Sequence, residues 1–112
     1  MSQLINWDQP REDLEWEIAK WLGWTKAING QYVSPAGKLY RKHQTCPWMR
    51  ITHDLQSAVT FATWLGIKDD LVINIITNEA IFIPEGKDPI SFTADNPALS
   101  VTHVIMEHLL DK

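Results

Sequence analysis

The chain has 112 residues, of which 45% are apolar, and its formal net charge is −4 at pH 7. This length fits one domain with its own core, and the acidic balance argues against binding along nucleic acids or on membrane surfaces, which both need excess positive charge. A membrane-spanning helix needs about eighteen consecutive apolar residues, and no stretch of the sequence approaches this length. The single cysteine, Cys46, has no partner for an internal disulfide, so we expect a cytoplasmic protein.

The first predicted element is a helix that begins at Pro10 and ends before Gly23. Asp8 or Gln9 can cap it, proline suits the first helical position, and glycine supplies a left-handed stop. Before this helix, we expect a flexible lead-in over residues 1–8. The stripe that faces the core has helical spacing and consists of Leu14, Ile18, Trp21 and Leu22. Negative charge near the helix start comes from Glu12, Asp13, Glu15 and Glu17.

Two short β-prone stretches follow the helix. The dipeptide Asn29-Gly30 lies between them and indicates a tight two-residue hairpin turn, which predicts strands near 24–28 and 31–34. Residues 34–47 show no regular period, so we expect a loop with at most one short strand near 39–40. An irregular loop of this kind is a candidate binding segment.

Two further helices are predicted. Thr52 can cap a helix that runs to about Leu65 and stops at Gly66. Its inward stripe is Leu55, Ala58, Val59, Ala62 and Leu65. The last helix starts at Asn96, has a proline in its first position and runs to about Leu110. The side chains that it buries are Ala98, Val101, Ile105 and Leu109.

Antiparallel strands are predicted over 71–77 and 80–83, which are β-branched runs separated by turn residues. Most of their side chains are apolar on both faces, so we expect cover on two sides. Residues 90–92 can add a short edge strand. Together the elements predict an α+β fold, in which a small antiparallel sheet is covered by about three helices in a helix–sheet–helix sandwich, as a single domain over residues 1–112.

The sequence lacks the motifs of common catalytic sites. It has no Gly-rich phosphate loop, no G-x-S-x-G elbow and no H-E-x-x-H pair. His43 and Cys46 have the spacing of half a zinc site, but a second half is missing, so we expect neither a metal nor another cofactor. A nucleophile pair could combine Cys46 with His43 or His53, although no third orienting group is evident. We therefore expect a protein that is not an enzyme.

Charge is distributed unevenly along the chain. Between Thr25 and His53 the sequence has five basic residues and no acidic one, and the same window carries Tyr32. Arginine and lysine hold phosphate, and an aromatic ring stacks on a base for about 1–3 kcal/mol. We therefore predict a site for a small anionic ligand such as a nucleotide, built from Lys38, Tyr40, Arg41, Lys42, Trp48 and Arg50. The alternative is a solvated basic loop whose aromatic residues cover the core.

Tryptophan is abundant, with six in the chain. On the first predicted helix, Trp16 lies away from the apolar stripe, so burying it requires a second contact surface, such as another subunit. We therefore predict Trp16 at the interface of a homo-oligomer. The alternative is an amphipathic side chain that stays partly exposed.

The run from Leu14 to Thr25 contains Ile18-Ala19 and then Gly23-Trp24-Thr25, and it resembles the opening of small phage and prophage proteins of the phage ABA-sandwich family. Other points of similarity are the Pro35-x-Gly37 loop, Pro47, the helix opening Thr52 to Ala58, and Phe92-Thr93-x-Asp95. The resemblance implies a helix–sheet–helix fold and a viral origin. It transfers no catalytic residue, and it does not include the basic, aromatic stretch 39–48.

These features lead us to expect a phage-derived accessory protein that sequesters a nucleotide immune signal in the cytoplasm of its bacterial host. One alternative is an inhibitor that binds a host protein through exposed tryptophans. A second is a small nucleotide hydrolase in which His43 or His53 acts as the base. The expected partners are the anionic ligand and further copies of the chain, and neither a membrane nor a long nucleic acid.

Overall fold

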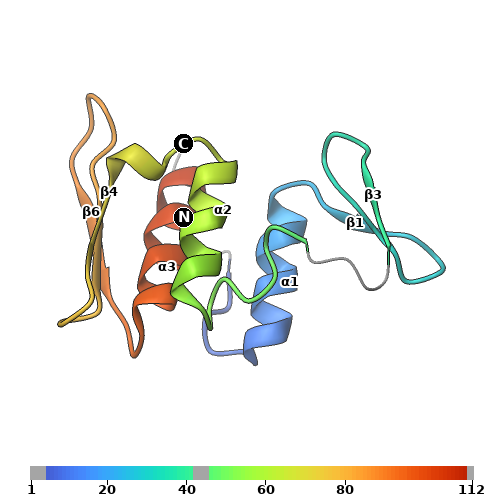
Figure 1. Ribbon diagram of the computed structural model, residues 1–112, viewed down its shortest axis with the longest axis horizontal. Helices are drawn as coiled ribbons and strands as arrows, with labels where there is room; N and C mark the ends of the chain where they lie inside the picture. The colour runs from blue at the N-terminus through green and yellow to red at the C-terminus, as the bar shows by residue number, and fades with distance from the viewer. Residues whose placement is uncertain (1–4, 42–45, 111–112) are drawn as a thin grey trace.

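The computed structural model describes residues 5–41 and 46–110, in which the helices lie between two small sheets (Figure 1). The helices of this part are α1 (Arg11–Trp21), α2 (Leu55–Trp64) and α3 (Pro97–Leu110), with a short 3-10 helix, η2 (Lys68–Asp70). Sheet A joins β1 (Thr25–Lys26), β2 (Tyr32–Val33) and β3 (Leu39–Tyr40), and sheet B joins β4 (Leu71–Asn74), β5 (Glu79–Phe82) and β6 (Ile90–Thr93). The α+β class is confirmed, but two antiparallel sheets replace the single sheet that was predicted.

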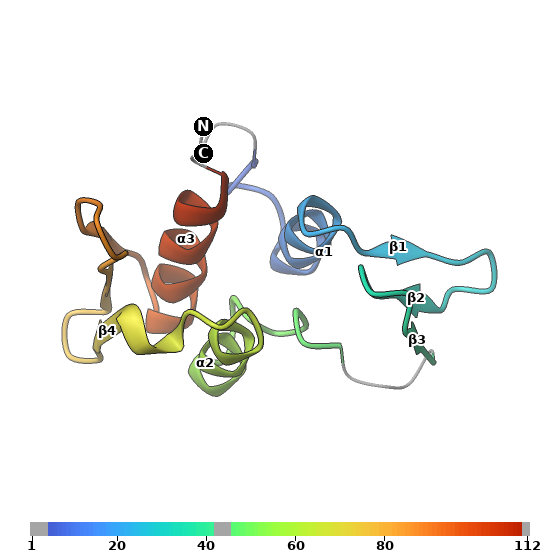
Figure 2. The same cartoon turned by 90° about the horizontal axis from the view of Figure 1, so that it is seen from above.

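The elements follow one another along the long axis of the molecule, whose extents are 41 × 28 × 25 Å. Sheet B stands at one end, α3 covers one of its faces, and α2 packs beside α3 (Figure 2). Helix α1 comes next, and sheet A extends beyond α1 at the opposite end (Figure 1). The helical layer therefore separates the two sheets.

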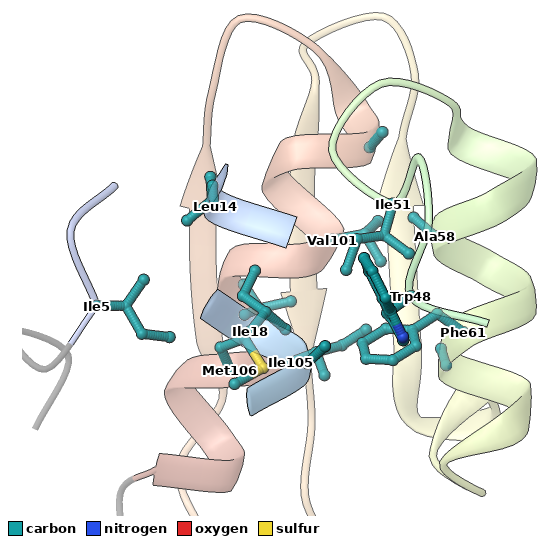
Figure 3. Packing of buried hydrophobic residues seen from close by; sticks show 14 of the residues in the cluster. Ile5, Leu14, Ile18, Trp48, Ile51, Ala58, Phe61, Val101, Ile105 and Met106 are labelled. Atoms are coloured by element: carbon teal, nitrogen blue, oxygen red, sulfur yellow. The ribbon is translucent and has the colours of Figure 1, made fainter. Parts of the chain in front are cut away.

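The three helices share one apolar core (Figure 3). At its centre are fully buried side chains from all three helices and from the loop before α2, namely Leu14, Ile18, Ile51, Phe61, Val101, Ile105 and Met106. The predicted lead-in is anchored to this core in its described part, because Ile5 is only 3% exposed and the ring of Trp7 lies 4.4 Å from that of His103.

The buried face of α1 is rotated relative to the predicted stripe. Leu14 and Ile18 are buried as expected, but Trp21 is 44% exposed, so its prediction as a core residue is wrong. Glu15 and Ala19 are buried instead. Because an α-helix turns by about 100° per residue, these two positions extend the buried face on the side away from Trp21.

Backbone conformation determines where α1 begins and ends. The helix begins after Pro10, which occupies the N-cap position without a side-chain hydrogen bond, so the predicted caps Asp8 and Gln9 are wrong. At the other end, Gly23 has a φ of 99°, which confirms the predicted left-handed stop. A Cβ atom on Gly23 would lie 3.3 Å from the Cβ of Pro35 in the β2–β3 turn. This close approach connects α1 with sheet A.

The caps of α2 and α3 are side chains. Asn96 caps α3 as predicted, since its Oδ1 accepts a backbone N–H at 2.8 Å. For α2 the cap is Asp54, whose carboxylate accepts the backbone N–H and the hydroxyl of Ser57. The predicted cap Thr52 is wrong, because it lies fully buried three residues before the first helical residue, Leu55.

Sheet A is short, with two residues in each strand. Ala27 donates its N–H to the carbonyl of Gln31 at 2.7 Å, so the hairpin loop has three residues rather than the predicted two. Within this loop Gly30 has a φ of 86°. The strand expected near 39–40 is confirmed and pairs with β2.

Sheet B is covered on one face in the described part of the chain. Strand β4 ends at Asn74, earlier than predicted, because the Asn74 side chain accepts the N–H groups of Ile76 and Thr77 and turns the chain. Helix α3 packs on the face that carries Ala80 and Phe82. The expectation of cover on both faces is wrong, since Val72 on the other face is 52% exposed.

Candidate functional site

Aromatic rings form a continuous chain of contacts between sheet A and the helices. Centroids of neighbouring rings lie 5.1 to 6.1 Å apart, within the range of favourable aromatic pairs. The rings of this aromatic chain belong to Trp16, Tyr32, Trp48, Trp24, Tyr40 and Trp64. Because the strands of sheet A are so short, these contacts hold the sheet on the helices.

One cleft opens along this chain of rings, and we call it the Trp16–Arg50 cleft. Its volume is about 320 Å³, at the lower end of the range of about 300–1,000 Å³ typical of small-molecule pockets. Its lining comes from α1, β2 and the loop before α2 and consists of Glu12, Glu15, Trp16, Tyr32, Trp48, Met49 and Arg50.

The walls of the cleft are aromatic. Trp16 and Tyr32 are half-buried, and their ring centroids lie 5.2 Å apart. Trp48 is 4% exposed, and its indole N–H has no hydrogen-bond acceptor among the described residues. A buried donor without an acceptor costs about 1–3 kcal/mol. The wall thus offers ring surface, and the Trp48 N–H is buried rather than open to the cleft.

A buried carboxylate fixes the back of the cleft. Glu15 is 5% exposed, and its Oε2 accepts the N–H of Thr52 at 3.0 Å and the Thr52 hydroxyl at 2.7 Å. The same oxygen lies 3.2 Å from Nδ1 of His53. Arg11 donates from Nη1 to the Thr52 carbonyl at 3.2 Å. Helix α1 therefore holds the loop before α2 through two side chains.

This anchoring places Arg50 at the rim of the cleft. Arg50 has a φ of 62°, a left-handed conformation that costs a residue with a Cβ about 1–2 kcal/mol. Its carbonyl accepts the N–H groups of His53 and Asp54 at 3.1 and 2.9 Å, which stabilise the turn. Strained residues of this kind concentrate at functional sites. The Arg50 side chain is exposed.

The cleft is electrostatically mixed. Arg50 supplies a guanidinium group that can hold a phosphate or carboxylate with two hydrogen bonds. Glu12 is exposed and brings a carboxylate, which accepts hydrogen bonds and repels anions. Glu15 is already engaged by Thr52 and His53. A ligand that carries both an anionic group and N–H donors matches this pair of charges.

A second hollow lies on the other side of Met49. It is lined by Tyr40, Cys46, Pro47, Met49, Gln56, Ser57, Thr60 and Trp64. Lys38 places its Nζ 5.0 Å from the centre of the Tyr40 ring. Burial raises the pKa of the Cys46 thiol to about 11, so the thiol is protonated at neutral pH and is a poor nucleophile.

The structure divides the predicted ligand site. Trp48 and Arg50 lie together in the Trp16–Arg50 cleft, whereas Tyr40 lines the second hollow and Nζ of Lys38 lies over the Tyr40 ring. Arg41 is exposed directly after β3. Lys42, like His43, lies outside the described residues. The described residues of the predicted site therefore do not gather at one place.

Trp16 has a different setting from the one predicted. It packs on Tyr32 and Trp48 of its own chain, and Nζ of Lys20 lies 5.9 Å from its ring. Tyr32 of sheet A and Trp48 of the loop before α2 thus supply contact surface for the half-buried Trp16 ring within its own chain, and its place at a subunit interface stays a prediction. Glu15 was not predicted as a site residue. The one sign in the sequence that it would be buried was its position three residues before Ile18 on the same helix.

Within residues 5–41 and 46–110, no three His, Cys, Asp or Glu side chains are grouped as a metal site requires, and none of the helices has the length and apolarity of a membrane span. The chain matches no known protein family, curated protein or solved structure.

Proposed function

We propose that this protein binds a small aromatic anion, a nucleotide, in the Trp16–Arg50 cleft and does so without chemistry. The observation that carries the proposal is that one cleft of about 320 Å³ joins the rings of Trp16, Tyr32 and Trp48 to the guanidinium group of Arg50. A base would stack on the rings, and a phosphate would receive hydrogen bonds from the arginine.

Glu12 adds selectivity among bases. A carboxylate only accepts hydrogen bonds, so it favours bases that present an amino group, which are adenine, guanine and cytosine, over uracil. Glu12 and Arg50 line the same cleft, so the donor edge of the base and the phosphate each have a partner of suitable charge.

We further propose sequestration as the biological role. The protein would be a phage-derived sponge that removes a nucleotide immune signal in the cytoplasm of its bacterial host. This role is supported by the resemblance of Leu14 to Thr25 to small phage proteins, and by a cleft that needs only affinity to act. Inhibition of a host protein is the alternative, for which the exposed rings of Trp21 and Trp64 are available.

Calorimetry and thermal denaturation with AMP, GMP, CMP, UMP and ribose 5-phosphate test the binding proposal at low and high salt. Saturation at a hundred times the dissociation constant adds about 2.7 kcal/mol of stability, which raises the melting temperature by about 10 °C for a domain of this size. We expect binding of the amino-bearing nucleotides to exceed that of UMP and to weaken with salt.

Arg50→Gln should weaken that binding about tenfold or more, because hydrogen bonds to charged groups contribute about 1.5–3 kcal/mol. Lys87→Gln is the matched control, since it removes a cation from the exposed turn after β5. Absence of binding by every compound, or equal binding by wild type and Arg50→Gln, would overturn the proposal.

A second function, nucleotide hydrolysis, is favoured by one observation. Nδ1 of His53 lies 3.2 Å from the buried carboxylate of Glu15, and the His53 side chain is 42% exposed. A carboxylate that orients an accessible histidine is the arrangement of a general base. Chromatography of the nucleotide after incubation separates the two functions: intact nucleotide supports capture, and product that disappears with His53→Gln supports hydrolysis.

A further inference from the structure

The outer face of sheet B, opposite α3, carries exposed apolar side chains. Val72 and Ile83 are 52% and 48% exposed, and in the β4–β5 turn Ile75 and Ile76 are 67% and 90% exposed. We call these four residues the sheet B patch. Clusters of exposed, large apolar side chains on a domain surface mark interaction sites.

The surroundings of this patch are acidic. From Lys68 to Asp95 the chain has two basic and six acidic residues, so its net charge is 2 − 6 = −4. The acidic residues are Asp69, Asp70, Glu79, Glu85, Asp88 and Asp95. A partner for the sheet B patch therefore needs apolar side chains within a basic surface.

The opposite end of the same molecule has these properties. On sheet A and its hairpin loop, Ile28 is fully exposed and Leu39 is 51% exposed. Three exposed cations lie on or next to the same sheet: Lys26 and Lys38, whose Nζ atoms lie 5.6 and 5.0 Å from the ring centres of Tyr32 and Tyr40, and Arg41, which directly follows β3. No acidic residue occurs between positions 25 and 41. We call Ile28, Leu39 and these three cations the sheet A patch.

The two patches cannot meet within one chain. They belong to sheets at opposite ends of a molecule that is 41 Å long, with the helices between them (Figure 1). A second copy can bring them together. Pairing two copies through their sheet B patches would instead bring two acidic surfaces into contact, and no opposite charge would offset their repulsion.

We propose that the sheet B patch binds the sheet A patch of a second copy, so that the chain associates head to tail. Such a contact is heterologous, and each bound copy still offers one free patch of each kind. The proposal does not depend on ligand binding in the Trp16–Arg50 cleft.

Sedimentation velocity over a range of protein and salt concentrations tests this contact. We expect association that increases with protein concentration and decreases with salt. Ile76→Lys places a cation on the sheet B patch opposite a basic partner, and Ile28→Asp places an anion on the sheet A patch opposite an acidic partner. Both positions are at least 90% exposed, so neither variant disturbs the core.

Each variant alone should be monomeric. In a mixture, Ile28→Asp retains its sheet B patch and Ile76→Lys retains its sheet A patch, so the two should form a heterodimer that does not extend further. Asp13→Asn is the charge-matched control for Ile76→Lys, because it changes the net charge equally at an exposed site on α1, and it should associate like wild type.

Three results would overturn the proposal. These are a wild-type protein that stays monomeric, self-association that survives in Ile28→Asp, and a mixture of the two variants that remains monomeric. Survival in Ile28→Asp would indicate pairing through the sheet B patch alone. Nucleotide binding by either variant is measured separately, so failure of this contact is distinguishable from failure of the ligand site.

Discussion

His103 is a histidine held neutral by its packing. Its ring is stacked on Phe92 with centroids 3.6 Å apart and lies 4.4 Å from the ring of Trp7. Burial lowers the pKa of His103 below its ordinary value of 6.5, and the nearby carboxylate of Glu107 opposes this shift. Its buried Nδ1 has no hydrogen-bond partner among the described residues. The folded protein therefore favours the uncharged ring.

This packing predicts a loss of stability in mild acid. Because the pKa of His103 is lower in the folded state, the unfolded chain binds the proton first as the pH falls. The stabilising contribution that is present above pH 6.5 is therefore lost as the pH falls through the pKa of the folded state. Urea unfolding at a series of pH values measures it. His103→Phe keeps a ring in place and should show a flatter pH dependence; an equal slope in both proteins would contradict this explanation.

Glu15 predicts a coupling between stability and binding. Glu15→Ala leaves the buried N–H and hydroxyl of Thr52 without their acceptor, at about 1–3 kcal/mol for each unsatisfied group. Loss of this anchor also frees the turn that positions Arg50, so nucleotide affinity should fall. Urea unfolding and calorimetry measure the two effects, with the exposed Asp13→Ala as control. Unchanged stability would show that Thr52 finds other partners.

Cys46 provides a test by chemical reactivity. Its thiol is 1% exposed and burial raises its pKa to about 11, so a thiol reagent at neutral pH should modify it only after unfolding. The rate of labelling should therefore increase with urea in parallel with the unfolding transition. Rapid labelling of the native protein would place the thiol at an accessible site.

At the scale of elements, the junction between α1 and sheet A depends on Gly23. Gly23→Ala meets two penalties, because its φ of 99° is unfavourable for alanine and the new Cβ would lie 3.3 Å from Pro35. Gly37→Ala is the matched control, since its φ is 87° but nothing lies within 4 Å. The φ penalty is about 1–2 kcal/mol for each variant, so Gly23→Ala should be the less stable in urea unfolding. Equal losses would mean that Pro35 moves aside.

The types of the elements were predictable from the sequence because local patterns determine them. Asn96 before Pro97, and Gly23 after an amphipathic stretch, specify helix ends through the chemistry of single residues. Thr52 misled the prediction because a residue that suits a cap also suits a buried hydrogen bond. Whether Thr52 caps the helix, as Asp54 does, or donates to the buried Glu15 carboxylate depends on tertiary packing, which a local pattern does not contain.

The candidate site was only partly predictable for the same reason. The absence of acidic residues between Thr25 and His53 drew attention to Trp48 and Arg50, which line one cleft. The carboxylates of the cleft come from α1, far away in the sequence, so a search for local charge could not find them. The two hollows share Met49 and are otherwise lined by different residues, so the division of the predicted residues between them depends on tertiary packing.

At the scale of the whole molecule, the α+β class was predictable but the arrangement of the strands was not. Strand pairing depends on which edges meet after collapse, and the sequence offered no means to decide between one sheet and two. The two sheets lie at opposite ends of the molecule (Figure 1). The segment that forms sheet A is basic and aromatic in sequence, whereas the segment that forms sheet B is acidic and apolar. The nucleotide proposal uses the Trp16–Arg50 cleft next to sheet A. The association proposal uses the exposed patches on the two sheets.

The most direct test of the central claim follows the indole N–H signals in a proton–nitrogen correlation spectrum during titration with GMP. Trp16 and Trp48 line the cleft, whereas Trp7 packs on His103 and Trp21 lies outside the cleft lining, so each signal reports on a known place once assigned by tryptophan-to-phenylalanine variants. We predict saturable shifts of the Trp16 and Trp48 signals while those of Trp7 and Trp21 stay unchanged. Unchanged Trp16 and Trp48 signals at saturating nucleotide, or shifts confined to the other tryptophans, would contradict the account.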